Sequence, residues 1–599
     1  MAGLDGPPEL PDRWYGYEGV DLVVLATADG TALEAVSEAR FAALEEWVRR
    51  GGRLVVSVAR NWDQVAASRL AELLPISFDP QGTVSQRQLS GLEAFCGSKS
   101  PLIPPGAVEG VPVARVRARR GVSLAEEASL PLIVRGPYGF GEVTVVALDL
   151  DRPPFDRWEG RRDFWRAVLE LPEGAAQGGP AFFGMGNRSS YTAINDLSSQ
   201  LRVVLEAFEG VQLVPFGLVA FFIGLYILLI GPADYFLLKK VWKRLEMTWV
   251  TFPLCVVLVS AAAYFTAYAL KGRELRANQV EVIDIDVESG LVRGTTWFSL
   301  FSPRIDHYSL SVQPQLGQLA PGRPGALVSW LGLPEASLGG MYRRGGVGLF
   351  RRGYRFGPDA QSVEDVPIQV WSTKSFSAQW QQEASGLLDV VGPSGRGGRG
   401  TGAARLHNPD SSYLVGALSH HLDQPLEQCV LLFGNNAYLI GSDSRDNDGD
   451  GSVDEADERV LAPGVTVPLG EFVPERAGPL QSQPRPRRLQ GELQQQVQLE
   501  TGLLATPYDR TNADPDALMR MMMFYKAAGG ASYTQGMTHS YLAFIDLSGH
   551  LKMGRAVLLG KLPASAPALT QILRDGKALR SHAKVHTYVR FLIPVDSRQ

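Results

Sequence analysis

The sequence predicts a multidomain protein with an α/β amino-terminal domain, two transmembrane helices and a β-rich, sandwich-like carboxyl-terminal region. Three observations predict this class. Apolar strand patterns flank an amphipathic helix near the start, two long uncharged runs occupy 211–230 and 249–270, and short alternating segments separated by Pro and Gly follow. With 599 residues, of which 45% are apolar, the chain is long enough for several domains with separate cores.

We expect residues 14–175 to form the α/β domain. Apolar strand patterns cover 21–27 and 53–58, and 37–50 between them has helical spacing. The apolar positions of that helix are Phe41, Leu44, Trp47 and Val48. Gly51 follows as a helix stop. Because the strands are apolar throughout and joined by a helix, they predict a parallel sheet covered on both faces.

The rest of the domain adds two strands, a closing helix and one excursion. Residues 130–134 and 143–150 have strand patterns, and 161–171 has helical spacing. We expect 75–120 to be an irregular excursion from the sheet. The glycine-rich 136–141 enters a strand and lacks a GK[ST] sequence, so it predicts a hairpin turn and no phosphate loop.

Residues 211–270 are predicted to form a two-helix transmembrane hairpin, preceded by a linker with an amphipathic helix at 176–210. At about 1.5 Å per residue, twenty helical residues cross the roughly 30 Å of hydrocarbon in a bilayer. The alternative is a buried hairpin in a soluble domain. The length of the two runs and their lack of charge favour the membrane.

The loop between the runs favours one orientation. It carries Lys239, Lys240, Lys243 and Arg244, and such loops stay cytoplasmic. Positive charges outside the runs make the bias moderate. A hairpin returns the chain to the side it left, so both large halves share one compartment, which we expect to be extracytoplasmic. The expected location is the cell inner (cytoplasmic) membrane, with a multi-pass topology.

This orientation requires export, but residues 1–13 contain no apolar core typical of a signal peptide. Either both halves are cytoplasmic, or the natural chain begins further upstream. We expect the second, because the sequence enters a domain almost at once.

After the spans, the sequence predicts a β-rich domain at 277–390, a flexible Gly/Arg linker at 391–402 and a second β-rich domain at 403–599. Short strand patterns occur at 279–286, 295–301, 308–312, 366–371, 429–433 and 585–594. Their spacing is typical of antiparallel sandwiches.

A helix is predicted at 515–527, with Asp514 as the N-cap, Pro515 in the first turn and Gly529 as the stop. It is rich in methionines, namely Met519, Met521, Met522 and Met523. We expect these side chains to fill a core; an adaptable binding face is the alternative.

The acidic loop 446–457 has the spacing of an EF-hand-type calcium loop. Its predicted ligands are Asp446, Asp448, Asp450, Ser452 (through its carbonyl), Asp454 and Asp457. Gly451 permits the sharp turn that lets alternate oxygens converge. Strand patterns flank the loop, so we expect a structural calcium between strands; a solvated acidic hairpin loop is the alternative.

The histidines predict no second metal site. His420 and His421 are adjacent, so their side chains diverge on a strand. His582 and His586 have a helical metal-site spacing but enter a strand pattern, where four residues span roughly 13 Å.

Several segments carry a family resemblance: 17–25, 44–56, 139–149, 225–235, 248–254, 284–286 and 293–303. They resemble uncharacterised bacterial (planctomycete-type) membrane proteins that carry a degenerate class I glutamine amidotransferase-like domain. The resemblance covers most of the chain. It implies a flavodoxin-like, amidotransferase-like fold for the α/β domain and no established activity.

Catalysis in the α/β domain would need a cysteine nucleophile on a tight strand-to-helix turn and a histidine base. Cys96 lies in the excursion and no such turn leads into it, while the first histidine is His307, beyond both spans. We therefore expect no catalytic residues and no enzymatic activity.

The net charge of −5 argues against nucleic acid as a partner. The leading hypothesis is a membrane-anchored, non-enzymatic scaffold or binding protein of the bacterial cell envelope. Its partners would be the lipid bilayer and other envelope or membrane proteins. The alternative is an accessory subunit of a membrane transport system, and an enzyme with an amidotransferase-like domain comes third.

Overall fold

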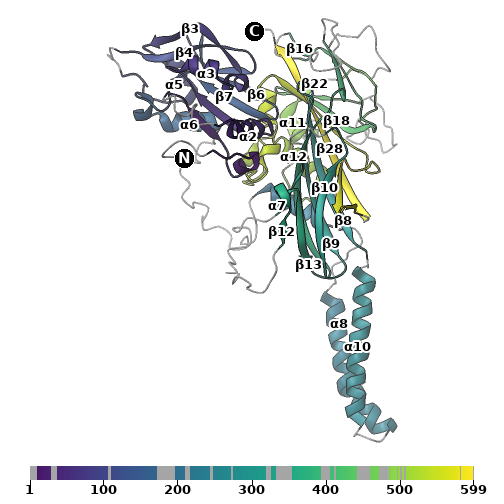
Figure 1. The fold of residues 1–599 in the computed structure, drawn as a ribbon. Helices are drawn as coiled ribbons and strands as arrows, with labels where there is room; N and C mark the ends of the chain where they lie inside the picture. Colours follow the sequence, from purple (N-terminus) through teal and green to yellow (C-terminus); the bar gives the residue numbers. More distant parts are fainter. Residues whose placement is uncertain are drawn as a thin grey trace.

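The computed structural model describes residues 10–28, 37–104, 109–170, 196–208, 216–242, 247–271, 274–318, 325–331, 354–392, 405–409, 413–441, 459–470, 483–484, 486–494, 497–499, 502–504, 507–579 and 582–597. An α/β domain lies against one side of a large β-region, and a helical hairpin extends from the end of that β-region (Figure 1).

The elements of the α/β domain are η1 (Trp14–Tyr17), β1 (Val23–Ala26), α2 (Glu38–Arg49), β2 (Arg53–Ser57), α3 (Trp62–Ala67), α4 (Leu70–Leu73), β3 (Ile76–Gln86), α5 (Ser90–Cys96), β4 (Val111–Ala118), β5 (Val122–Glu127), β6 (Leu130–Tyr138), β7 (Gly141–Val146), η2 (Phe155–Arg157) and α6 (Arg161–Leu169).

The sheet of this domain has the strand order β1-β2-β7-β6-β5. The predicted parallel arrangement is confirmed for β1, β2 and β7, whereas β6 and β5 continue the sheet antiparallel. Ser37 caps α2, because its side chain accepts a hydrogen bond from Arg40 N. Gly51 follows the helix at φ +130°, a region that favours glycine. The predicted hairpin turn at 136–141 joins β6 to β7.

The prediction that 75–120 is irregular is wrong. Within this segment β3 and β4 pair antiparallel as a separate two-stranded sheet, and α5 lies between them in the chain. The pairing is interrupted between Phe78 and Thr83, and a bulge of this kind hides the alternating pattern that would identify a strand. The segment does leave the main sheet, as expected.

The linker and hairpin contain α7 (Leu197–Glu206), α8 (Phe216–Leu228), the π-helical turns η4 (Leu229–Ala233) and η5 (Leu237–Trp242), α9 (Asp234–Phe236) and α10 (Thr248–Lys271). The first helix continues past the predicted end at Ile230 to Trp242. Pro232 lies inside it, and the wider π-helical turns accommodate the missing N–H of the proline. The stretches Val219–Lys240 and Thr248–Thr266 are long and apolar enough to cross a membrane.

The β-region after the hairpin contains β8 (Arg276–Asp286), β9 (Leu291–Ser302), β10 (Asp306–Pro314), β11 (Leu327–Trp330), β12 (Arg355–Phe356), η8 (Pro358–Ala360), β13 (Ser362–Ile368), β14 (Ser372–Glu383), β15 (Leu388–Val391), β16 (Leu406–Asn408), β17 (Gly416–His420), β18 (Leu426–Phe433), β19 (Asn436–Leu439), β20 (Val460–Leu461), β21 (Val467–Leu469) and β22 (Pro486–Arg488).

The chain ends with α11 (Leu489–Leu493), β23 (Val497–Leu499), β24 (Gly502–Leu504), α12 (Pro515–Met523), α13 (Gly530–Tyr533), η9 (Ala543–Ile545), α14 (Ser548–Lys552), β25 (Arg555–Lys561), β26 (Thr570–Arg574), β27 (Lys577–Ala578) and β28 (His582–Ser597).

One central sheet of eleven strands organises this region, with the main order β11-β14-β9-β8-β28-β25-β18-β19-β22. It contains strands from both predicted β-rich regions, 277–390 and 403–599. The last strand, β28, lies in the middle, parallel to β8 and antiparallel to β25. The described carboxyl end of the chain therefore joins the two halves of the sheet.

The two faces of the central sheet bury different layers. Ile283 and Ile285 of β8 pack into a core with two smaller sheets, β12-β13-β10-β26-β27 and β15-β17-β21. Val280 and Val282, which point the other way on the same strand, pack with the helical layer of α7, α11, α12 and α14. This arrangement agrees with the predicted sandwich and adds helices on one face.

The predicted capped helix is confirmed as α12. Asp514 accepts hydrogen bonds from the backbone N–H groups of Asp516 and Ala517, and Pro515 is in the first turn. The helix ends at Met523, before the predicted 527. Its methionines are buried in the core of the helical layer, as expected.

Candidate functional site: the carboxyl edge and the junction

The parallel strands of the α/β domain end in a group of polar side chains. Thr27 follows β1 and donates from Oγ1 to the carbonyl of Ser57 at 2.8 Å. Ser57, the last residue of β2, donates to the carbonyl of Leu148 at 2.8 Å. After β7, Asp149 Oδ1 accepts from Ala59 N at 3.0 Å. Open α/β sheets bind ligands at this edge, because the loops there diverge to form a crevice.

Two further side chains complete this group, which we call the carboxyl edge (Thr27, Ser57, Arg60, Asn61 and Asp149). Asn61 donates to the carbonyls of Thr27 and Ala28 at 2.7 and 2.8 Å and holds the loop after β1 in place. Arg60 lies 3.6 Å from Asp149 Oδ2, and its side chain is 55% exposed. Burial raises the pKa of Asp149 above its ordinary value, and hydrogen bonding and Arg60 oppose that rise. The carboxyl edge therefore offers an accessible guanidinium beside a buried carboxyl.

Cys96 is not part of this group. It is the last residue of α5, and its Sγ donates to the carbonyl of Leu92 in the same helix at 3.1 Å. Burial raises the pKa of the thiol, which disfavours the nucleophilic thiolate. The strand-to-helix turn after β2 contains Arg60 and Asn61 in place of a cysteine.

The opposite edge of the same strands docks on the central sheet. We call the contact the junction; its residues are Arg50, Gly139, Phe140, Asp284, Asp286, Arg293, His550, Arg555 and Arg590. Arg293 of β9 donates from Nη1 to the carbonyl of Arg50, just before β2. Its guanidinium also lies 4.6 Å from the ring centre of Phe140, just before β7. The amino ends of β2 and β7 therefore face the central sheet.

Asp284 sits at the centre of the junction between two arginines. Its Oδ2 accepts from Arg293 Nη2 at 2.5 Å and its Oδ1 accepts from Arg590 Nε at 2.6 Å. All three residues are buried. Burial raises the pKa of Asp284, but the two guanidiniums outweigh it and leave the pKa below its ordinary value. These residues are neighbours on β9, β8 and β28, and Arg590 also donates to the carbonyl of Ile545 in the helical layer at 2.7 Å.

A second pair of side chains forms hydrogen bonds with the turn between β6 and β7. Arg555 Nη1 donates to the carbonyl of Gly139 at 3.0 Å and lies 3.3 Å from Asp286 Oδ1. His550 Nε2 lies 2.9 Å from the carbonyl of Phe140 and donates to it, since a carbonyl only accepts. Burial, followed by the nearby Arg555, lowers the pKa of His550 to about 4, so its ring is neutral at pH 7.

Glu170, at the end of α6, adds a link at the margin of the junction. It pairs with Arg135 at 2.6 Å inside the α/β domain and with Lys526 of the helical layer at 3.1 Å. Burial raises its pKa, but Lys526 and Arg135 outweigh this and bring the pKa to about 2.

The junction was not predicted from the sequence, although it left two signals. Asp284 and Asp286 are charged side chains within the predicted strand 279–286, and Arg293 lies just before the predicted strand 295–301. The glycine-rich turn 136–141 was interpreted only as a hairpin turn. A charged side chain inside a buried strand requires a partner, but the pattern does not show which distant segment supplies it.

The predicted calcium ligands, from Asp446 to Asp457, lie outside the described residues, and the calcium site stays a prediction. Among the described residues, no three His, Cys, Asp or Glu side chains are grouped to hold a metal ion. His582 and His586 lie on β28, as expected for a strand. His420 and His421 diverge: the ring of His420 is buried beside the carbonyl of Leu461, whereas the ring of His421 contacts Asp389.

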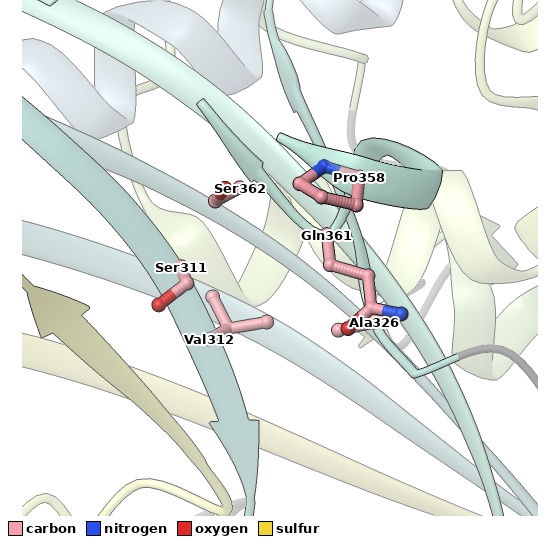
Figure 2. A pocket seen from close by; sticks show the side chains of 6 residues that line it. All are labelled: Ser311, Val312, Ala326, Pro358, Gln361 and Ser362. Atoms are coloured by element: carbon pink, nitrogen blue, oxygen red, sulfur yellow. The ribbon is translucent and has the colours of Figure 1, made fainter. Parts of the chain in front are cut away.

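A separate cavity of about 380 Å³ opens beside β10 and β13 (Figure 2). Its lining residues are Ser311, Val312, Ala326, Pro358, Gln361 and Ser362. Hydroxyl and amide groups line it together with apolar side chains. Because no lining side chain is charged, the cavity offers hydrogen bonds but no electrostatic selection.

The fold and these sites define a mixed α/β protein in which strands predominate, with two helices long enough to span a membrane. No protein-family model matches the chain, and no curated protein matches it.

Solved structures show only distant similarity. A cytoplasmic protein from Salmonella typhimurium LT2 is 21% identical over 27% of this chain and 76% of its own, with a TM-score of 0.19. An exo-beta-1,4-mannosidase from Opitutaceae bacterium strain TAV5 is 17% identical over 28% of this chain and 26% of its own, with a TM-score of 0.17. The yeast delta-COP-I mu-homology domain complexed with a Dsl1 peptide is 7% identical over 53% of this chain and 98% of its own, with a TM-score of 0.23. Similarities at this level support no inference about function.

Proposed function

We propose that this chain is a membrane-anchored, non-enzymatic scaffold or binding protein of the bacterial cell envelope. The observation that carries the proposal is the orientation of the α/β domain. Its amino strand edge is held in the junction by Arg293, Arg555 and His550. Strands that dock by their amino ends turn their carboxyl ends away, so the carboxyl edge remains available to a partner.

The hairpin supports membrane anchoring. Aromatic side chains on both helices are exposed, with Phe216 at 85% and Trp249 at 89%. Each such side chain contributes roughly 1.5–3 kcal/mol when it leaves water. Lipid hydrocarbon is the environment that matches a pair of helices with apolar residues on their outward faces.

Contacts on both sides of the hairpin support the proposed topology. Asn278 of β8 donates to the carbonyls of Leu205 and Ala207, at 3.0 and 3.1 Å, across the two chain segments that flank the hairpin. Phe208 packs against Phe301 at 5.7 Å. Both large halves then lie on one side of the membrane. The end of the hairpin that carries Lys239 and Lys240 favours the cytoplasm, so the two halves lie on the extracytoplasmic side. We therefore propose an inner-membrane, multi-pass location.

A binding role fits the chemistry of the α/β domain. Burial raises the pKa of the Cys96 thiol, and the turn where a nucleophile would stand carries Arg60 and Asn61. Arg60 is positioned by a buried carboxyl and remains accessible, which suits recognition of an acidic group on a partner protein.

The experiment is affinity purification of the full chain from cross-linked native membranes, with identification of the bound proteins. We compare the wild type with Arg60→Glu at the carboxyl edge and with Arg117→Glu as the matched control. Arg117 on β4 is 79% exposed and pairs with Asp79, which is not a residue of that edge. We expect an envelope protein that is lost with Arg60→Glu and kept with Arg117→Glu.

Three outcomes would overturn the proposal. Recovery of an ATPase and a permease would favour the accessory subunit of a transport system. Recovery of no partner, or of partners indifferent to the Arg60 change, would remove the binding role of the carboxyl edge.

A further inference from the structure

We infer that the end of the β-region nearest the hairpin carries a rim of apolar side chains that lies in the headgroup layer of the bilayer. The rim consists of Ile305, Trp330, Phe356 and Val370. The inference rests on the proposed membrane anchoring and adds to it a surface that would hold the β-region directly on the membrane.

The connection to α10 identifies the membrane-facing end. Helix α10 ends at Lys271 and β8 begins at Arg276, so a few residues at about 3.5 Å each separate them. Arg276 pairs with Phe301, one residue before the end of β9. The start of β8 and the end of β9 therefore lie next to the hairpin (Figure 1).

Two turns project from this end. Ile305 lies in the turn after β9 and is 73% exposed. Val370 lies in the turn between β13 and β14 and is 36% exposed. The neighbouring Trp371 donates from its backbone N–H to the carbonyl of Ser302 at 2.7 Å, which brings the two turns together.

Two aromatic side chains continue the rim. Trp330 is 49% exposed and Phe356 is 53% exposed. Tyr354 joins them, with ring centres 6.0 Å from Trp330 and 5.9 Å from Phe356. Trp330 of β11 pairs with Phe376 of β14, which in turn pairs with Phe298 of β9. Phe298 is three residues from Phe301, so Trp330 lies roughly 10 Å along the strand direction from the membrane-facing end.

Lipid headgroups fit this surface in depth and chemistry. Trp and Tyr side chains concentrate where hydrocarbon meets water, because each combines an apolar ring with one polar group. Arg304 and Arg355 flank the rim and are 68% and 72% exposed. Each also contacts an aspartate within the protein, Asp306 and Asp365, yet their exposed guanidiniums can reach lipid phosphates.

The distribution of exposed apolar residues favours lipid over a chance scatter. Outside the hairpin, the described residues with large exposed apolar side chains are Val20, Val203, Ile305, Trp330, Phe356, Val370, Tyr413, Val460 and Tyr541. Isolated residues of this kind are normal on a protein surface. The rim differs, because Ile305 and Val370 lie in turns at one end, the aromatic cluster of Trp330, Tyr354 and Phe356 begins roughly 10 Å from that end, and the end continues into the hairpin.

The test places a fluorescent label on the rim of the full chain in nanodiscs whose lipids carry a nitroxide quencher at headgroup depth. Cys96→Ser and Cys255→Ala remove two cysteines, and Cys429 is fully buried. Into this background we introduce Ile305→Cys or Val370→Cys as reporters, because both residues lie in the turns at the membrane-facing end.

The control is Tyr541→Cys, which is 57% exposed. Leu197 N donates to the carbonyl of Thr538, so the segment that contains Tyr541 lies beside the start of α7. The hairpin follows the other end of α7, and the ten residues of this helix span about 15 Å. We expect the label on Ile305→Cys to lose roughly half or more of its emission, as at an interfacial site, and the control label to lose little.

A separate Cys96→Ser chain keeps Cys255 in α10 as a reporter of the anchor, with a nitroxide placed in the acyl chains. Quenching at Cys255 without quenching at either rim position overturns the rim and leaves the anchor intact. Quenching at none of the three positions removes the anchor and the rim together. Equal quenching of the rim and the Tyr541→Cys control also overturns the inference.

Discussion

Replacement of Asp284 by asparagine should disrupt the junction more than the loss of either arginine. The carboxylate is 1% exposed and is the shared partner of the Arg293 and Arg590 side chains, which are 4% and 0% exposed. Asp284→Asn keeps the shape of the side chain but leaves two buried guanidiniums without their shared counter-ion. Breaking a buried ion pair from one side costs about 3–5 kcal/mol.

The matched variant is Arg293→Met, which leaves the Asp284–Arg590 ion pair intact, with one negative and one positive charge that balance. It removes a charged hydrogen bond to the carbonyl of Arg50, worth about 1.5–3 kcal/mol. The double variant should lose less than the sum of the two single losses, because only one guanidinium then remains unpaired. We expect a coupling of about 1–3 kcal/mol between the two positions.

Thermal unfolding of the detergent-solubilised full chain, followed by tryptophan fluorescence, measures these losses. At about 2–4 °C per kcal/mol for a domain of 150–250 residues, Asp284→Asn should lower Tm by roughly 6–20 °C. A smaller loss in Asp284→Asn than in Arg293→Met would refute the reasoning. Strict additivity in the double variant would refute it as well, because it would mean that the two arginines do not share the carboxylate.

Three further predictions follow from single sites. His550 has a pKa of about 4 in the folded protein against an ordinary 6.5, so the unfolded chain binds the extra proton first and stability should fall between pH 6.5 and 4. The loss should approach about 3 kcal/mol at pH 4 and be smaller in His550→Gln; equal pH profiles of Tm in both chains would contradict this. A Cβ at Gly51 would lie 2.8 Å from Arg293 Nη1, whereas nothing lies within 4 Å at Gly434, which also has a positive φ. Gly51→Ala should therefore loosen the junction and make the α/β domain more susceptible to limited proteolysis, whereas Gly434→Ala should not. Similar digestion of both variants would show that the effect comes from backbone strain and not from the clash with Arg293. Saturable calcium binding by the full chain, measured by titration calorimetry, should be lost in Asp446→Ala, and unchanged binding would exclude the predicted loop.

Local patterns in the sequence were sufficient for the elements whose burial is regular. The strands β1, β2 and β7, the capped helices α2 and α12 and the two long apolar helices follow from short-range periodicity, capping residues and length. The pattern was insufficient where the pairing is interrupted, as between β3 and β4. It was also insufficient at Pro232, where the first long helix continues past a residue that ordinarily ends one.

The sequence by itself determined that this chain has an α/β start, a pair of apolar helices and a long series of strands. These properties depend on residues within about a helical turn or a strand of one another. Only the tertiary structure decided that β28 joins the two halves of the central sheet and that Asp284 binds arginines from two neighbouring strands. It also decided that the α/β domain docks by its amino edge. The physical reason is that a buried charge requires a partner, while the partner's position in the sequence is set by the fold and not by local spacing.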